Sequence, residues 1–386
     1  MIKLISNTID QTDLNALSDW LKGSPRLTKG ALTVEFENKW SAWMGRKYSI
    51  YVNSGSSANL MMIYSLIEGK KLKNKKIVVP SICWSTTIAP LMQFGLTPIL
   101  CDVEPNTLCI DSYKLEELLI REKPAAIFLV NVLGFLGDMN ILNILAKKHD
   151  CIILEDSCET LGTTFKGKKA GTFGLMSTFS MFFGHHISTI EGGMICTDDK
   201  NIRDLLLMLR SHGWDRDLDK NDADDLKKLH NVTEFNSMYT FYHPAFNLRS
   251  TDLQAFLGLR QLNKLETIIS NRHANFKLYQ EKIKSRWKPN PKFYPNDIIS
   301  NFAYPIIDPK RDQISNLLKL NDIEHRPIIC GSIDKQPFYK KMNYKQKLDL
   351  TFSHRVHDQG LYVPNHDKLT VEEITLISNL VNEAIQ

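Results

Sequence analysis

Hydrophobic residues along the chain follow two patterns that alternate. Short apolar runs rich in β-branched residues predict buried strands, and apolar residues at three- and four-residue spacing between them predict amphipathic helices. Strands that alternate with helical crossovers are typical of an α/β fold with a mostly parallel central sheet. The predicted strands are 48–52, 77–80, 98–102, 125–132, 151–155, 178–183 and 193–197.

The pattern changes after residue 250. A long helix is predicted from Thr251 to about Lys284, and a proline-broken stretch after it predicts a linker. A further strand at 302–307 and a final helix from Val371 then indicate a small α+β unit. We therefore predict a large domain at 1–250 and a smaller C-terminal domain at 251–386, joined by the long helix.

The composition is that of a soluble globular protein, with 43% hydrophobic and 24% charged residues among 386. A net charge of +5 is too diffuse to argue for nucleic acid, and no apolar run reaches membrane-spanning length. Seven cysteines without a C-x-x-C pair argue against a zinc site or a disulfide framework, so we expect no metal. With no signal-peptide pattern, we expect a cytoplasmic protein that binds neither nucleic acid nor membrane.

One segment stands out as a candidate for chemistry. The apolar strand at 178–183 ends at Gly184 and is followed by His185 and His186, after which a Glu-Gly-Gly turn leads into the next strand. Parallel α/β sheets bind their ligands at the carboxyl ends of the strands. A titratable pair at this position therefore predicts an active site around His185.

Other predicted strands end in residues that suit a phosphorylated aromatic cofactor. Ser56 and Ser57 lie in a Gly/Ser turn before a helix, which favours either an anion site or a simple helix cap. Ser180 adds a possible phosphate donor, and Trp84 follows another strand, where it could cover a flat ring. Asp156 ends a buried strand and needs a cationic partner such as a protonated pyridine nitrogen. This set is compatible with pyridoxal-phosphate chemistry.

Long stretches of the chain resemble the sugar-nucleotide aminotransferases of the DegT/DnrJ/EryC1/StrS group. The resemblance implies a PLP-dependent transferase-like fold (fold type I), and the matching segments appear in the family's order. They are Leu27-Thr28-Lys29-Gly30, Asn53-Ser54-Gly55-Ser56-Ser57-Ala58, Glu155-Asp156-Ser157-Cys158-Glu159-Thr160-Leu161-Gly162, Glu191-Gly192-Gly193 and residues 246–254.

One departure from the family pattern bears on the function. Family aminotransferases carry a lysine six residues before the glutamate of Glu-Gly-Gly, and counting back from Glu191 gives His185. Imidazole can move protons but cannot form an imine with the cofactor's aldehyde. A His-His pair here, with His212-Gly213-Trp214 further on, is similar to the sugar 3-dehydratases of the family.

The resemblance implies a pyridoxamine 5'-phosphate/pyridoxal 5'-phosphate enzyme. It is expected to remove the C3 hydroxyl of a nucleotide-linked 4-keto-6-deoxyhexose, with GDP as the expected nucleotide, CDP and dTDP left open, and glutamate as amino donor. It also implies a homodimer with shared active sites. The implied roles are His185 as catalytic base, Asp156 at the ring nitrogen, Glu159 at the ring 3-hydroxyl, Asn247 at the neighbouring subunit's cofactor phosphate, and His212, Arg216, Arg249 and Arg326 as substrate contacts.

Several alternatives remain at this stage. The chain could be a sugar-nucleotide aminotransferase that does without the usual lysine, or an inactive cofactor-binding regulatory homologue. Arg216, Arg249 and Arg326 could instead form surface ion pairs, and His212 could cap a helix C-terminus. His186 is expected only to shape the turn.

Overall fold

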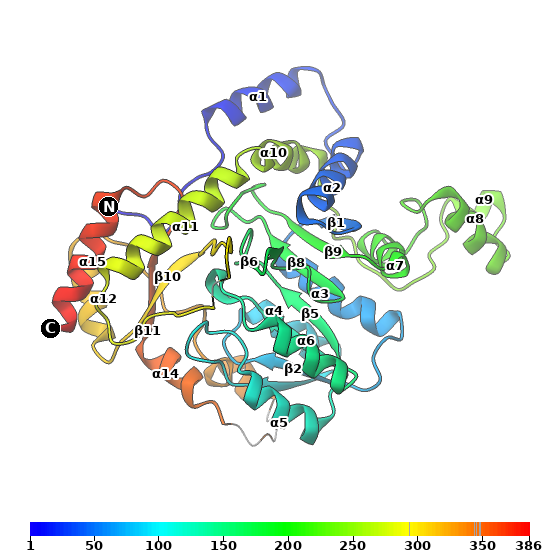
Figure 1. The fold of residues 1–386 in the computed structure, drawn as a ribbon. Coiled ribbons are helices and arrows are strands. Elements are labelled where there is room, and N and C mark those ends of the chain that lie inside the picture. Colours follow the sequence, from blue (N-terminus) through cyan, green and yellow to red (C-terminus); the bar gives the residue numbers. More distant parts are fainter. Residues whose placement is uncertain (293, 343, 345, 347–348) are drawn as a thin grey trace.

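The computed structural model describes residues 1–386 except 293, 343, 345, 347 and 348. Its centre is a seven-stranded sheet in the order β1-β9-β8-β5-β4-β2-β3 (Figure 1). Strand β9 runs in the opposite direction to the other six strands, which are parallel to one another, so the predicted mostly parallel α/β sheet is confirmed. The strands are β1 (Tyr48–Val52), β2 (Lys76–Pro80), β3 (Thr97–Cys101), β4 (Ala126–Val130), β5 (Ile152–Asp156), β8 (Met176–Ser180) and β9 (Gly193–Thr197).

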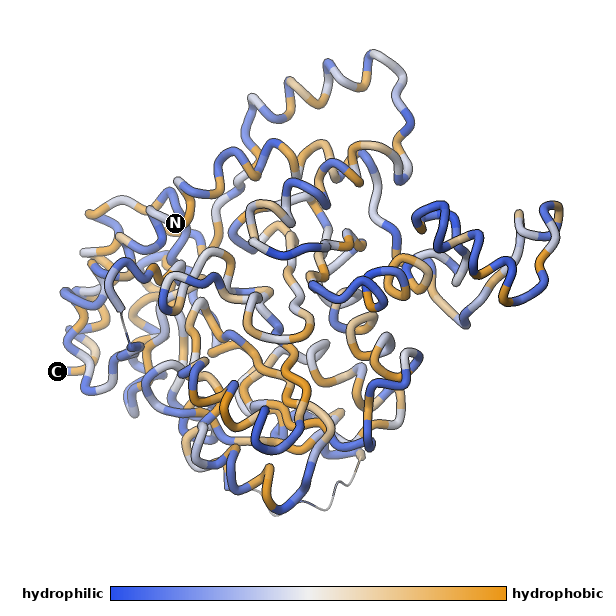
Figure 2. Tube along the Cα trace, turned by 45° about the vertical axis from the view of Figure 1, so that its right-hand side comes forward, coloured by the Kyte–Doolittle hydropathy of each residue, from blue (hydrophilic) through white to orange (hydrophobic). Residues whose placement is uncertain are grey.

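Alternating strand residues build a core on each face of this sheet. Ile77 and Val79 of β2 are buried with α3, α4 and α7, whereas Val78 between them is buried with α5 and α6 on the other face. Helix α2 covers that second face over β1, β8 and β9 through Phe36 and Trp40. Figure 2 shows hydrophobic stretches concentrated in this body. The helices involved are α2 (Ala31–Met44), α3 (Gly55–Glu68), α4 (Ser85–Gln93), α5 (Ser112–Glu122), α6 (Met139–Lys148) and α7 (Lys200–Arg210).

The C-terminal part has its own two-stranded antiparallel sheet. Strand β10 (Ala303–Ile307) pairs with β11 (Gly360–Pro364), and helices pack beside this pair. The first residues of the chain join it, because Ile2 forms a parallel bridge with Ile323. The domain boundary at 250/251 stays a prediction. The helices are α11 (Leu265–Lys282), α12 (Arg311–Leu320), α13 (Pro337–Lys340), α14 (Thr351–Gln359) and α15 (Val371–Ile385), with the 3₁₀ turn η2 (Ile333–Lys335). The 3₁₀ turn η1 (Val132–Gly134) follows β4 of the central sheet.

The prediction of a single long helix from residue 251 is wrong. The chain forms α10 (Asp252–Leu262), which packs on α2, and then the separate helix α11. Between them the N–H groups of Asn263 and Lys264 bond to carbonyls three residues back, at Arg260 and Gln261, and this tighter turn redirects the chain.

Helices α8 (Lys220–Leu229) and α9 (Glu234–Ser237) project from the body (Figures 1 and 2). Helix α1 (Gln11–Lys22) lies over α10, and a short hairpin joins β6 (Thr164–Phe165) to β7 (Lys168–Lys169). No helix in the described part of the chain is both long and apolar enough to cross a membrane.

Candidate active site

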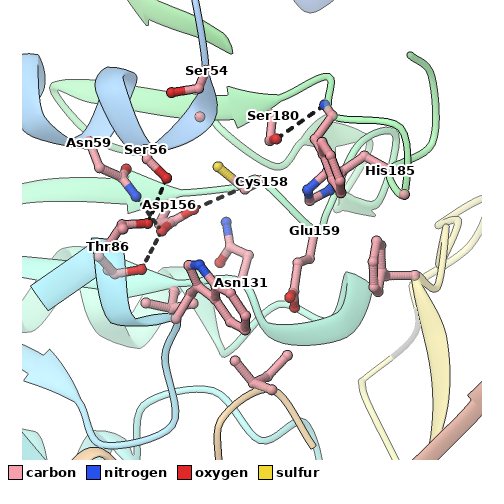
Figure 3. Close-up of a pocket in the computed structure, with 18 of the residues that line it drawn as sticks. Ser54, Ser56, Asn59, Thr86, Asn131, Asp156, Cys158, Glu159, Ser180 and His185 are labelled. Carbon is pink, nitrogen blue, oxygen red and sulfur yellow. Dashed lines mark hydrogen bonds between the residues drawn. The ribbon is translucent and has the colours of Figure 1, made fainter. Parts of the chain in front are cut away.

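A cavity of about 440 Å³ lies at the carboxyl ends of β4, β5 and β8, beside the start of α3. Phe302, Ile329 and Tyr362 of the C-terminal part close its other side. Figure 3 shows polar side chains from several strand ends converging on it. The residues predicted for the site that line the cavity are Ser56, Trp84, Asp156, Glu159, Ser180 and His185.

Asp156 at the end of β5 is held by three hydrogen bonds. The Asn59 amide (2.8 Å) and the Thr87 hydroxyl (2.7 Å) donate to one carboxylate oxygen, and the Cys158 backbone N–H (3.1 Å) donates to the other. The Thr178 hydroxyl in turn donates to the Asn59 side-chain oxygen. These bonds fix a nearly buried carboxylate at the edge of the cavity, where it can accept a further proton donor.

The neighbouring carboxylate has a different role. Glu155 is fully buried and accepts backbone N–H groups from Gly171, Phe173 and Gly174 at 2.7–2.8 Å. Its oxygens are therefore used to hold the loop before β8. Of the two adjacent acidic residues, only Asp156 lines the cavity.

The start of α3 forms an anion-binding corner. Ser54 caps the helix by accepting the Ser57 N–H, and Ser56 bonds to the Thr86 hydroxyl (2.8 Å). A Cβ on Gly55 would lie 2.6 Å from the Cβ of Ser180, so only glycine lets β8 approach here. Unpaired N–H groups at a helix N-terminus and nearby hydroxyls suit a phosphate. Ser57 itself does not line the cavity and bonds to Ser54.

The histidine loop is a hairpin between β8 and β9. Ser180 and Gly193 are paired, and Met181 N–H donates to Gly192 C=O (2.9 Å). The strand predicted to reach residue 183 ends at Ser180, because the chain turns at Phe182, whose carbonyl accepts the His185 N–H. The loop thus carries His185 from the sheet edge into the cavity (Figure 3).

His185 is positioned as an uncharged base. Its ring lies 5.3 Å from that of Phe302, and its Nδ1 has no hydrogen-bond partner among the described residues. Burial, helped by the nearby charge of Arg272, lowers the pKa of His185 to about 4 against an opposing effect of the Cys158 backbone. At neutral pH the imidazole is therefore free to accept a proton.

Glu159 lies in the same cavity as a protonated acid. It accepts the Leu133 N–H (2.9 Å) and shares the cavity with the Asp156 carboxylate. Burial raises the pKa of Glu159 to about 8, and the charge of Asp156 adds to this increase, while the Leu133 N–H opposes it. A carboxylic acid here can donate a hydrogen bond at neutral pH.

His186 points away from this cavity and anchors the loop. It is 1% exposed, and its Nε2 lies 3.0 Å from the carbonyl oxygen of Ser300 in the C-terminal part. The expectation that it only shapes the turn is compatible with this contact.

A second polar group lies outside the cavity, around Trp214. The guanidinium of Arg216 is 3.8 Å from the Trp214 ring, and that of Arg249 is 5.7 Å from it. Arg249 also donates to the Asn247 side chain (3.0 Å) and approaches His212 Nε2 (3.4 Å). This group, called the Trp214 cluster below, comprises His212, Trp214, Arg216, Asn247 and Arg249.

The remaining predicted residues take the following positions. The His212 N–H donates to the Phe246 carbonyl (2.6 Å), and the alternative that its ring caps α7 stays a prediction. Arg326 pairs through its backbone with Tyr362, which lines the cavity, while its guanidinium bonds to the His325 carbonyl. The substrate roles predicted for His212, Arg216, Arg249 and Arg326 stay predictions.

Sequence reasoning missed several residues of the cavity. Asn59 and Thr87 lie next to motifs that were recognised, and the need of Asp156 for donors was a signal that could have found them. Phe302 and Tyr362 come from distant parts of the chain with no local signal. Among the described residues that line the cavity, none is lysine.

The chain matches known proteins over nearly its whole length. Residues 7–382 match the model of the DegT/DnrJ/EryC1/StrS aminotransferase family. The chain is 34% identical to the GDP-4-keto-6-deoxy-D-mannose 3-dehydratase of Yersinia pseudotuberculosis, over 98% of each chain. It is similar to a solved GDP-4-keto-6-deoxymannose-3-dehydratase with a trapped PLP-glutamate geminal diamine (TM-score 0.90, 34% identity, 99% and 100% of the chains). It is equally similar to a histidine-to-asparagine variant of such an enzyme with bound GDP-perosamine (TM-score 0.89, 34% identity, 99% and 100%).

Proposed function

The chain belongs to the DegT/DnrJ/EryC1/StrS aminotransferase family, and on that basis we propose that it is a pyridoxamine-phosphate-dependent dehydratase of nucleotide sugars. It removes the C3 hydroxyl of GDP-4-keto-6-deoxy-D-mannose to give a 4-keto-3,6-dideoxy sugar. The observation that carries the proposal is an uncharged histidine, His185, inside the cavity at the position where the family's aminotransferases have lysine.

The residues of the cavity fit a pyridoxamine phosphate ring. The carboxylate of Asp156, fixed by three donors, suits the protonated ring nitrogen, and Ser56 and Ser180 flank the anion-binding corner at α3. Glu159 can bond to the ring 3-hydroxyl, and the exposed indole of Trp84 can cover the ring face. When bound, this cofactor supplies an amine for the sugar ketone and a ring that accepts electrons.

His185 then moves the protons of the reaction. Its free base removes a proton from the carbon that joins ring and amine, and the resulting imidazolium protonates the departing C3 hydroxyl. The C3–O bond breaks and water leaves. His185 cannot form an imine with the cofactor, so its role is confined to carrying protons. The cofactor would supply the nitrogen that hydrolysis by water releases as ammonia, and glutamate would supply the replacement nitrogen and become 2-oxoglutarate.

We further propose a homodimer in which the Trp214 cluster of one subunit serves the cavity of the other. The cluster collects two guanidinium groups and Asn247 outside the cavity of its own chain, and guanidinium groups suit a diphosphate. In this arrangement the cluster of one subunit would contact the nucleotide and the cofactor phosphate bound in the other.

Product analysis tests the proposed reaction. The protein is incubated with GDP-4-keto-6-deoxymannose, pyridoxamine phosphate and glutamate, and products are resolved by mass spectrometry. We expect a keto-dideoxy sugar with ammonia, and a loss of about 10²- to 10⁴-fold in rate for His185→Asn. An amino sugar as the main product would show an aminotransferase instead, and turnover unaffected by His185→Asn would exclude the role given to His185.

A further inference from the structure

The segment Met1–Asn7 is bound to the C-terminal part of the chain at its first residues. The Ile2 N–H donates to Asp322 C=O (2.8 Å), and the Ile2 carbonyl accepts the Glu324 N–H (3.0 Å). The carboxylate of Glu324 accepts the Leu4 N–H (2.8 Å). These bonds hold residues 2–4 in line with residues 322–324.

The other end of the segment is fixed as well. The Ser6 hydroxyl donates to the Asp367 carboxylate (2.9 Å), and the Lys368 ammonium donates to the Asn7 carbonyl (2.7 Å). Leu4 and Ile5 lie between the two sets of bonds, and both line the cavity. The family match starts at residue 7, so this piece of cavity wall lies outside the matched range.

Ile5 contributes to the histidine side of the cavity. A Cβ on Gly184 would lie 3.7 and 3.8 Å from two carbons of the Ile5 side chain, in ordinary van der Waals contact. Phe182 and Phe302 line the same cavity close to His185. Figure 3 shows Asn59, Asp156 and Thr86 on one side of the cavity and His185 on the other. Leu4, Ile5, Phe182 and Phe302 therefore form an apolar part of the wall near His185, while Glu159 is a polar residue of the lining on the same side.

The proposed function places the sugar on this apolar side, because its reacting carbons must lie within reach of His185 while Asp156 holds the ring. A 6-deoxyhexose differs from a hexose in carrying a methyl group in place of a hydroxymethyl group. A wall of aliphatic and aromatic carbon accommodates the methyl group and leaves a 6-hydroxyl without a hydrogen-bond partner.

We propose that Leu4 and Ile5 determine specificity by contacting the C6 methyl group of the sugar and so select 6-deoxy over 6-hydroxy nucleotide sugars. This inference rests on the proposed function. It assigns sugar selection to a segment bound to the C-terminal part rather than to the strand ends that hold the ring.

Binding of stable sugars tests this without turnover. GDP-mannose and its 6-deoxy congener are titrated by calorimetry into His185→Asn protein loaded with pyridoxamine phosphate, alone and with Ile5→Ala or Leu4→Ala added. We expect the preference for the 6-deoxy sugar to fall about tenfold in either added variant. Ile5→Val should retain it, and so should Ile144→Ala, a matched change at an exposed position on α6.

Three outcomes separate the two proposals. A selective loss of preference supports the inference even if the wild-type protein forms no deoxy sugar, in which case only the proposed reaction fails. Equal weakening for both sugars, or no change, overturns the inference even if the wild-type protein turns over. Melting temperatures of Ile5→Val and Ile5→Ala show whether the wall variants remain folded.

Discussion

Glu159 is a partly buried acid in the cavity, and its charge state depends on folding. Burial raises its pKa to about 8 from an ordinary value of 4.5, so the folded protein holds a proton that the unfolded chain has released between these pH values. The protonated Glu159 side chain therefore contributes to the free energy of unfolding in full below about pH 4.5, and this contribution is lost as the pH rises through 8.

We predict that Glu159→Gln abolishes the decrease in stability that Glu159 causes as the pH rises. The free energy of unfolding of the wild-type protein without cofactor should fall relative to the variant by about 1.4 kcal/mol per pH unit between pH 5 and 8. Urea unfolding across this range measures the difference. Glu117→Gln, at an exposed position of α5, should follow the wild-type slope, and parallel curves for Glu159→Gln would show that Glu159 is ionised when folded.

Much of the site could be predicted from single residues. His185, Asp156, Glu159, Ser56, Ser180 and Trp84 all follow or flank a strand end, and parallel strands bring such positions to one edge. Leu4, Phe302 and Tyr362 could not be predicted, since their place in the cavity depends on how the C-terminal part packs on the sheet. That packing is set by many distant contacts and leaves no local pattern.

Among the elements, β9 and the start of α3 meet in a close backbone contact at Gly193. A Cβ on Gly193 would lie 2.2 Å from the Ser54 carbonyl oxygen and 2.7 Å from the Gly55 nitrogen. Both neighbours are backbone atoms, which cannot rotate away as a side chain could.

Gly193→Ala should therefore destabilise the protein by about 3 kcal/mol and displace the anion-binding corner. Urea unfolding measures the first effect, and titration with pyridoxamine phosphate measures the second. Gly23→Ala is the matched control, because its Cβ would meet only the Trp20 carbonyl at 3.4 Å, and it should change stability by less than about 1 kcal/mol. A Gly193→Ala protein that is as stable as the wild type and still binds the cofactor would contradict the expected clash with the backbone of Ser54 and Gly55.

The elements themselves were largely predictable. The seven strands of the central sheet begin and end within three residues of the predicted ranges, because buried parallel strands read as short apolar runs. The break between α10 and α11 was missed, since neither Asn263 nor Lys264 prohibits a helix. The antiparallel direction of β9 also has no sequence signal of its own beyond the short return turn.

At the scale of the whole molecule, shared active sites can be tested by subunit mixing. In the proposed dimer, each active site combines the cavity of one subunit, which contains His185, with the Trp214 cluster of the other, which contains Asn247. The two substitutions should therefore damage an active site from different subunits. We predict that inactive His185→Asn and Asn247→Ala proteins, dissociated and reassembled together, regain about a quarter of wild-type activity, because half of the dimers then hold one intact site.

The control mixes His185→Asn with Asp156→Asn. Both residues line the same cavity, so no combination of these subunits restores a complete site, and activity should stay absent. No recovery in the first mixture would mean that each chain completes its own site. Recovery in the control would instead contradict the placement of His185 and Asp156 in one cavity.

The segment that carries His185 departs from the sheet at Ser180 and re-enters it at the directly opposite residue, Gly193. Between these two residues the segment is itself held by the body, since His186 contacts the Ser300 carbonyl and Met181 and Ile187 are buried in the core. An exchange confined to residue 185 would therefore alter the reactivity of the site while the rest of the hairpin and the register of β8 and β9 are inherited unchanged.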